Sequence, residues 1–374
     1  MKRYFFILTF LLTALSITQK AQAAMRVSLL TCDAGEDLYT IWGHTAIRII
    51  DSANHTDIVY NYGTFDFNEP NFIAKFVKGN LRYFISADSY PNFIYEYQYF
   101  GRNVHEQILK MSEAEKLKWQ EALTFNLSGD NKYYLYNFIT DNCTTRIKDG
   151  LAKHVVLSDS SFGIQSFRAE VVSAPYKGGL PWIGFGIDLL LGAVSDQKPT
   201  SQQAPFLPQL LYNKVNTNPA IVLKTTHYNF NKSNPQKGIM PIYILGAILI
   251  IYILLGFSNN KLGLKAARVL DIALLLILGI AGVLVFYMSQ ISMHTACHEN
   301  YNLIWMHPLY LIAIPVYFIS KKWTGYLGFI YFIPTVLLMF GAYWIPQHFS
   351  QTVIALMAIT LTLQVRLIKK ASQP

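Results

Sequence analysis

The chain has 374 residues, 52% of them hydrophobic and 14% charged, and its formal net charge is +9. So large an apolar fraction excludes an intrinsically disordered chain, and the length allows more than one domain. The positive charge does not indicate nucleic-acid binding, because residues 24–238 hold 20 Lys and Arg against 20 Asp and Glu.

The N-terminus has the pattern of a secretory signal peptide, which we assign to residues 1–23. Lys2 and Arg3 give it a basic start, residues 5–17 are apolar, and Ala21-Gln-Ala23 is a small-residue cleavage site. We therefore expect residues 24–228 to form an exported domain. Residues 229–238 are polar and contain a Pro and a Gly, which predicts a linker.

Five apolar stretches follow the linker, each of about the length needed to cross a hydrocarbon core of roughly 30 Å. They are residues 239–257, 269–291, 303–319, 325–345 and 350–367. Lys and Arg occur only in alternate connections: eight lie in 258–268, 320–324 and the C-terminal tail, and none lies in the other two. This predicts a five-helix transmembrane domain over 239–370, with a cytoplasmic C-terminus and the preceding domain outside the cytoplasm. Asp271, near the start of the second stretch, is then most simply a charge at the cytoplasmic interface.

Cys143 is the strongest candidate for chemistry in the exported part. It follows Asp141 and Asn142, both good helix N-caps, and precedes a run that is typical of a helix through Lys153. A thiol in the first turn of a helix faces unpaired N–H groups and the positive end of the helix dipole. Both favour the thiolate, which is the nucleophilic form.

His44 is the candidate base. It starts an alternating, β-branched run over 44–51 that predicts a strand, and strands are also expected at 25–31 and 57–62. Asn61, on the strand expected to pair with that of His44, is our choice for the group that orients the imidazole, with Asp66 as second choice. A thiol on a helix and a histidine on a sheet is the papain-type arrangement, and the order His before Cys predicts a permuted papain-like α+β domain.

Other interpretations of these residues stay open. A disulfide between Cys32 and Cys143 would exclude the catalytic role, and an unreactive buried Cys143 is a further alternative. Arg146 and Asp149 lie three residues apart on one helix face, so we expect them to pair with each other. A capping box of Ser112 and Glu115 predicts a helix over 112–128.

Two further segments are unusual. Residues 180–194 are apolar but too short to span a membrane, and Asp188 interrupts them, so they form either a buried core helix or one that dips into the outer leaflet. The outward loop 292–308 is rich in polar and aromatic side chains, which form an interfacial belt, hold a lipid headgroup or face the Cys143 site. We expect substrate contacts from His294, Asn300, Asn302 and Trp305, and no metal or other cofactor.

Taken together, these segments resemble the Lnb-type lipoprotein N-acyltransferases of bacteria. The resemblance is carried by residues 43–48 around His44, 61–67, 142–149 around Cys143, 206–208, and the loop from His294 to Trp305. It implies a domain similar to the permuted papain-like domains of the lecithin:retinol acyltransferase kind. It also implies that Cys143 takes up a fatty acyl group as a thioester and passes it to the N-terminal amine of a lipoprotein, with His44 as base. Four residues match motif positions of this family without an assigned role: Asn61, His294, Asn300 and Asn302. The segment Cys297-His298-Glu299 departs mildly from the family's pattern.

We therefore expect a multi-pass acyltransferase of the bacterial inner membrane whose N-terminal domain is periplasmic. Its expected partners are a phospholipid acyl donor, a lipoprotein acceptor and the membrane. One alternative is a membrane-anchored cysteine peptidase or amidase acting on cell-envelope peptides. The other is a membrane sensor or assembly factor in which the Cys–His pair is incidental.

Overall fold

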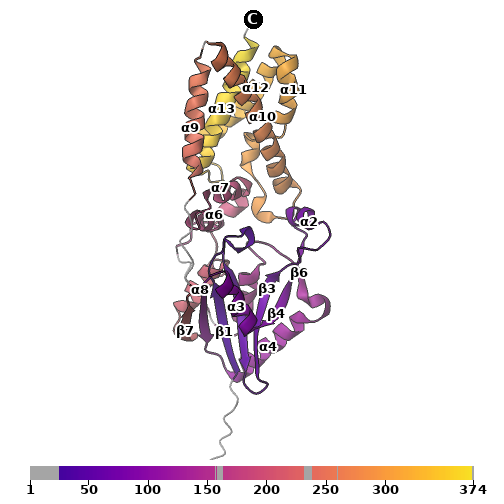
Figure 1. Cartoon of the computed structure of the whole chain (residues 1–374), viewed down its shortest axis with the longest axis vertical. Helices are drawn as coiled ribbons and strands as arrows, with labels where there is room; N and C mark the ends of the chain where they lie inside the picture. Colours follow the sequence, from indigo (N-terminus) through magenta and orange to yellow (C-terminus); the bar gives the residue numbers. More distant parts are fainter. Residues whose placement is uncertain (1–24, 156, 158–162, 231–237, 259, 373–374) are drawn as a thin grey trace, which may run out of the picture.

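The computed structural model describes residues 25–155, 157, 163–230, 238–258 and 260–372. The predicted signal peptide and residues 231–237 of the predicted linker lie outside this range. A sheet domain and a bundle of long helices lie at opposite ends of an elongated molecule, and the C-terminus is at the far end of the bundle (Figure 1). Helices α2, α6 and α7 lie between the two (Figure 1).

One seven-stranded sheet forms the centre of the first domain, and every neighbouring pair of strands in it is antiparallel. The strand order is β6-β4-β3-β2-β1-β5-β7. The strands are β1 (Met25–Cys32), β2 (His44–Asp51), β3 (Thr56–Thr64), β4 (Arg82–Ser89), β5 (Val104–Leu109), β6 (Tyr133–Leu135) and β7 (Val222–Tyr228). The three strands expected from the alternation of apolar residues are thus confirmed as β1, β2 and β3.

Helices cover both faces of the sheet. Because successive side chains of a strand point to opposite faces, neighbouring residues of one strand pack against different helices. Leu29 and Ile47 pack with side chains of α4, α5 and α8, whereas the neighbouring Leu30 and Ala46 pack against α3. The helices of this domain and of the junction are α2 (Phe72–Lys78), α3 (Tyr90–Tyr99), α4 (Glu113–Leu127), α5 (Cys143–Leu151), α6 (Phe167–Lys177), α7 (Pro181–Leu190) and α8 (Pro208–Asn216). The predicted capping box is confirmed, since Ser112 and Glu115 bond to each other's backbone at the start of α4.

The C-terminal part is helical throughout its long segments, as predicted. Its helices are α9 (Pro241–Gly256), α10 (Lys261–Gln290), α11 (Tyr310–Ile319), α12 (Lys321–Gly341) and α13 (Gln351–Ala371). Among the described residues, three helices are long and apolar enough to cross a membrane by length and composition: α10, α12 and α13. The third predicted span is shorter than expected, because residues 301–304 form a 3-10 turn and α11 begins only at Tyr310.

Asp271 corrects another expectation. The sequence suggested a charge at the cytoplasmic interface, but the Asp271 carboxylate is buried within the bundle. It accepts hydrogen bonds from Arg366 on α13, at 2.7 and 3.1 Å, and from the hydroxyls of Tyr252 and Tyr317. A buried ionised group needs such partners, so this carboxylate joins α9, α10, α11 and α13.

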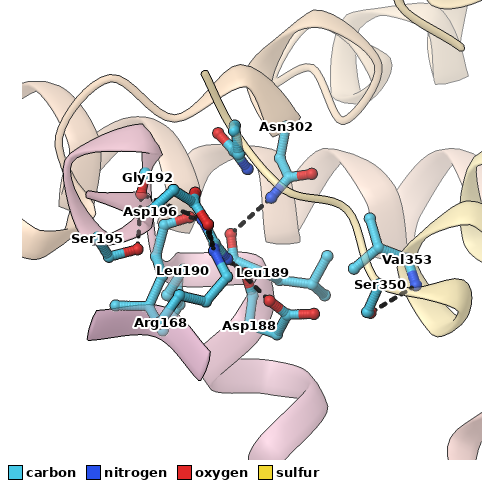
Figure 2. Close-up of polar contacts among 12 residues, drawn as sticks. Arg168, Asp188, Leu189, Leu190, Gly192, Ser195, Asp196, Asn302, Ser350 and Val353 are labelled. Atoms are coloured by element: carbon cyan, nitrogen blue, oxygen red, sulfur yellow. Dashed lines mark hydrogen bonds and ion pairs between the residues drawn. The ribbon is translucent and has the colours of Figure 1, made fainter. Parts of the chain in front are cut away.

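The junction between the two parts is built around α7. Phe185 of α7 packs into the core of the bundle, which favours a buried helix over one that dips into the outer leaflet. Arg168 on α6 donates to the carboxylates of Asp188 and Asp196 and to the carbonyls of Leu191 and Gly192, as Figure 2 shows. A guanidinium has five N–H donors. Because Arg168 is only 3% exposed, these donors need partners within the protein.

Loss of the Arg168 guanidinium should loosen this junction strongly. In Arg168→Leu, two carboxylates that are buried in the wild type lose their cation, which lowers the free energy of unfolding by about 3–5 kcal/mol. The reaction of Cys297, buried beside the junction, with a thiol reagent in detergent micelles measures local opening, and thermal unfolding measures the global effect.

Arg82→Ala is the matched control. Arg82 and Asp130 form an ion pair at 3.9 Å with both side chains exposed, and such pairs contribute little to stability. An Arg168→Leu protein as stable as Arg82→Ala would contradict the role assigned to Arg168.

Candidate active site

Cys143 is the first residue of α5, as predicted. The Asn142 side chain caps this helix: its Oδ1 accepts from the backbone N–H groups of Thr144 and Thr145 at 2.8 and 2.9 Å. Its Nδ2 donates to the carbonyls of Phe138 and Phe206 at 2.7 and 3.0 Å. Asn142 is 3% exposed, so one buried amide fixes the turn that presents the thiol.

His44 meets Cys143 from the sheet. It is the first residue of β2, and its side chain lies close enough to the thiol of Cys143 for each group to shift the pKa of the other. Its Nε2 lies 3.1 Å from Oδ1 of Asn61 on β3, which leaves Nδ1 as the ring nitrogen for the thiol. The structure therefore brings together Cys143, His44 and Asn61, the candidates for nucleophile, base and orienting group.

The strand and the helix are joined beside this pair by a contact that the sequence did not reveal. The hydroxyls of Thr45 and Thr144, which follow His44 and Cys143 in the chain, are 3.0 Å apart and buried. The Thr45 backbone N–H also helps to lower the pKa of the Cys143 thiol. Two threonines in adjacent motifs were visible in the sequence, but only the fold shows that they meet.

The environment of the pair favours its charged form. Burial alone would raise the pKa of the Cys143 thiol, but the charge and hydrogen bond of His44 outweigh it and hold that pKa below its ordinary value of 9.0. Burial would likewise lower the pKa of His44, but Cys143 and Asn61 together raise it above 6.5. Both shifts favour the charged forms of the two side chains, which is the direction that increases the reactivity of a thiol.

Glycines let the chain approach this pair closely. Gly63 lies in a bulge between β3 and β4, at φ +89°, and a Cβ there would be 3.5 Å from the Cβ of Cys143 and 3.9 Å from both the Tyr134 hydroxyl and the Tyr136 ring. A Cβ at Gly43, at φ +80°, would be 2.5 Å from the carbonyl oxygen of Cys32. Only glycine therefore fits beside His44, where the backbone of β1 approaches closely.

Several alternatives from the sequence can now be decided. All three cysteines are free, so Cys32 and Cys143 form no disulfide. Cys32 is buried against Tyr97, and its burial raises its pKa to about 12. The predicted pair of Arg146 and Asp149 is wrong: Arg146 instead forms two hydrogen bonds with Asp141, at 2.6 and 2.8 Å, because the turn before α5 folds back along the helix.

Three of the four residues of the outward loop that were expected to contact substrate bond to α7 or to each other. Asn300 and Asn302 donate to the last carbonyls of α7, those of Leu189 and Leu190, at 2.9–3.0 Å, and Trp305 donates to Oδ1 of Asn302. Figure 2 shows Asn302 reaching α7. All three loop residues are at most 5% exposed, so the loop caps α7 and gives them no free face for substrate.

His294, the fourth residue expected to bind substrate, lies against α2. Its Nε2 is 2.8 Å from the carbonyl of Phe76, and its ring faces that of Phe76. Within the described parts of the chain, no cluster of three or more His, Cys, Asp or Glu is placed to hold a metal ion.

Comparison with known families agrees with this two-part organisation. Residues 16–166 match the Lnb N-terminal periplasmic domain, and residues 232–372 match the Lnb transmembrane domain. The chain belongs to the Lnb family. No curated protein and no solved structure matches it, so the relation of its Lnb domain to permuted papain-like domains stays a prediction. Membership makes this a membrane protein with a periplasmic N-terminal domain.

The thiolate of the Lnb domain should be visible in its alkylation rate. For the full-length protein, the pH profile of the reaction of Cys143 with iodoacetamide should rise below pH 9.0, the ordinary thiol pKa. In His44→Ala the profile should move to higher pH, because burial remains and the neighbouring charge is lost. Cys32 and Cys297, whose burial raises their pKa to about 12, are internal controls that stay unlabelled. An unchanged profile in His44→Ala would contradict the assigned pair.

Removal of the orienting amide should slow the chemistry without unfolding the domain. In Asn61→Ala the imidazole loses the partner that fixes its ring, and the rate at which Cys143 reacts with iodoacetamide at neutral pH should fall about 10-fold to 100-fold. Asp66→Asn is the matched control, since the Asp66 carboxylate accepts from the nearby backbone N–H of Asn68 and not from His44. Equal losses in both variants would reject Asn61 as the orienting group.

Proposed function

We propose that this Lnb protein is an acyltransferase that moves a fatty acyl group through a thioester on Cys143 to the N-terminal amine of a bacterial lipoprotein. The observation that carries the proposal is the Cys143–His44 pair, in which the pKa of the thiol is lowered and that of the imidazole is raised. Family membership adds the setting, since the pair lies in a domain joined to a transmembrane domain.

The two half-reactions use the same two side chains. In the first, the sulfur of Cys143 attacks the carbonyl carbon of a phospholipid ester, the C–O bond breaks, and His44 gives its proton to the leaving oxygen. In the second, the lipoprotein amine attacks the thioester, His44 accepts the amine proton, and the thiolate leaves. The products are a lysophospholipid and an amide-linked acyl chain, and no cofactor is needed.

The position of the site near the bundle supports a lipid substrate. The turn that precedes α5 contacts the outward loop, where Nδ2 of Asn137 donates to the Thr295 hydroxyl at 2.9 Å. Asn137 is separated from Cys143 by only five residues, and Asp141 pairs with it in a backbone bridge. The thiol is therefore held close to the end of α10, the longest apolar helix described.

Intact mass measurement tests the proposal directly. Full-length protein in detergent is incubated with phospholipid, and the wild type should gain the mass of one fatty acyl group, removable by hydroxylamine. Cys143→Ala should gain none, and His44→Ala should gain it about 100-fold more slowly or less, as expected for loss of a general base. Cells lacking the protein should hold lipoproteins short of one amide-linked chain, and unchanged lipoprotein masses would refute the acceptor.

The peptidase alternative makes the opposite prediction. A cysteine peptidase or amidase with the same pair should cleave cell-envelope peptides in the absence of lipid and form no acyl adduct with phospholipid. Full retention of the cellular phenotype in Cys143→Ala would instead favour a protein whose Cys–His pair has no catalytic role.

A further inference from the structure

The short helix α2 and its surroundings expose aromatic and aliphatic side chains that nothing in the described chain covers. We call Tyr39, Phe67, Ile73 and Phe76 the α2 surface; their exposed fractions are 57%, 61%, 75% and 43%. The rings of Tyr39 and Phe67 are 5.9 Å apart, and Phe72 links Phe67 to Phe76 at 5.2 and 6.4 Å. No residue of α2 is buried. A contiguous exposed apolar patch of this kind marks a contact with a membrane or a partner.

The position of α2 favours the membrane. The backbone N–H of Met293, just beyond α10, donates to the carbonyl of Lys78 at 2.8 Å, and His294 bonds to Phe76. Gly79, at φ +82°, permits this contact, because a Cβ there would be 3.1 Å from that of Met293. Figure 1 shows α2 beside the end of α10 nearest the sheet domain. The depth of α2 is thus fixed by a helix that is long and apolar enough to cross the bilayer.

The apolar exposure of α10 continues onto α2. Phe286, Ile291 and Met293, at the sheet-domain end of α10 and just beyond it, are 45–54% exposed, and Met293 contacts α2. On α2 itself Lys75 and Lys78 are the only charged residues; Lys75 pairs with Glu69 at 2.7 Å, and Lys78, at the end of the helix, is exposed. Apolar side chains flanked by lysines are typical of a segment that lies at the lipid interface, where the amines reach the phosphate groups.

A series of aromatic rings leads from α2 to the thiol. Phe72 is 5.7 Å from Phe65, Phe65 is 5.3 Å from Tyr83, and Tyr83 stacks on Tyr136 at 4.5 Å. Tyr136 lies beside Gly63, which contacts Cys143. Cys143 and Phe65 both pack against the same core of the sheet domain. We call Phe72, Phe65, Tyr83 and Tyr136 the aromatic series.

We propose that the α2 surface is immersed in the outer leaflet of the membrane, and that the acyl chain of the lipid donor passes from there to Cys143 along the aromatic series. The immersion stands on the geometry of α2 alone, and the passage of the chain rests on the proposed function. Apolar rings and side chains stabilise an acyl chain outside the bilayer, because they remove its surface from water. The site then takes its donor laterally from the leaflet and needs no lipid free in solution.

Immersion is tested without any enzymatic activity. In the Cys143→Ala protein, Ile73→Cys is labelled with an environment-sensitive fluorophore, since the remaining thiols, Cys32 and Cys297, are buried. The protein is reconstituted in phosphatidylcholine and phosphatidylglycerol vesicles that contain spin-labelled lipid. Strong quenching at Ile73 is expected, while a label at the exposed Asn54, in the β2–β3 turn, should remain unquenched. Equal quenching at the two positions would overturn the immersion, whatever the protein catalyses.

Passage of the acyl chain is tested by comparing two donors. Ile73→Asp and Phe76→Asp should lower acylation of Cys143 by phospholipid in vesicles about tenfold, since a charge expels the α2 surface from the leaflet. Acylation by a water-soluble short-chain thioester should be unchanged. Phe125→Asp is the matched control, an aromatic residue 64% exposed on α4, away from the bundle.

Each outcome of this comparison is informative. Equal loss with both donors, or no loss with phospholipid, would overturn the passage along α2. If the wild type forms no adduct with either donor, the passage falls together with the proposed function, while the quenching result still decides whether α2 is immersed.

Discussion

A thiol and an imidazole held together inside a folded domain limit how the rest of that domain can be built. Burial alone would raise the pKa of Cys143 and lower that of His44, but the interaction between the two side chains, with Asn61 beside His44, reverses both shifts. The two side chains come from segments about a hundred residues apart, so β2 and α5 have to meet at one fixed point. Asn142, with four hydrogen bonds from one amide, and the Thr45–Thr144 contact supply that precision.

The same need for precision explains how the outward loop is used. Its backbone bonds to the chain around Gly192 and to Lys78, and its two asparagines close the end of α7. Gly192 has to be glycine, because any Cβ would overlap the carbonyl of His298. A loop with this many internal bonds is a rigid connection. The sheet domain therefore sits at a defined height over the bundle, which a flexible tether could not achieve.

Local signals in the sequence were enough for the elements that carry the site. Alternation predicted β2 and β3, and cap residues predicted the start of α5 at Cys143 and the N-cap of α4 at Ser112. Interactions that depend on the fold could not be obtained in this way. Asp149 was expected to pair with Arg146, but the actual partner, Asp141, lies on a turn that only the fold defines. Asn300 and Asn302 were interpreted as ligand-binding because a polar side chain beside a membrane has no visible partner until α7 is placed there. Asp271 was misjudged for the same reason.

The rigid connection has a consequence for the proposed transfer. An ester carbonyl of a phospholipid lies just below the headgroups, and attack by sulfur requires it within about 3–3.5 Å of the nucleophile. A domain that floated above the bilayer would have to extract the whole lipid into water. With α2 bonded to the end of α10 and the turn before Cys143 bonded to the outward loop, the thiol stays near the leaflet. The donor then moves a short way along apolar side chains, and the same side chains keep water from the thioester until an amine arrives.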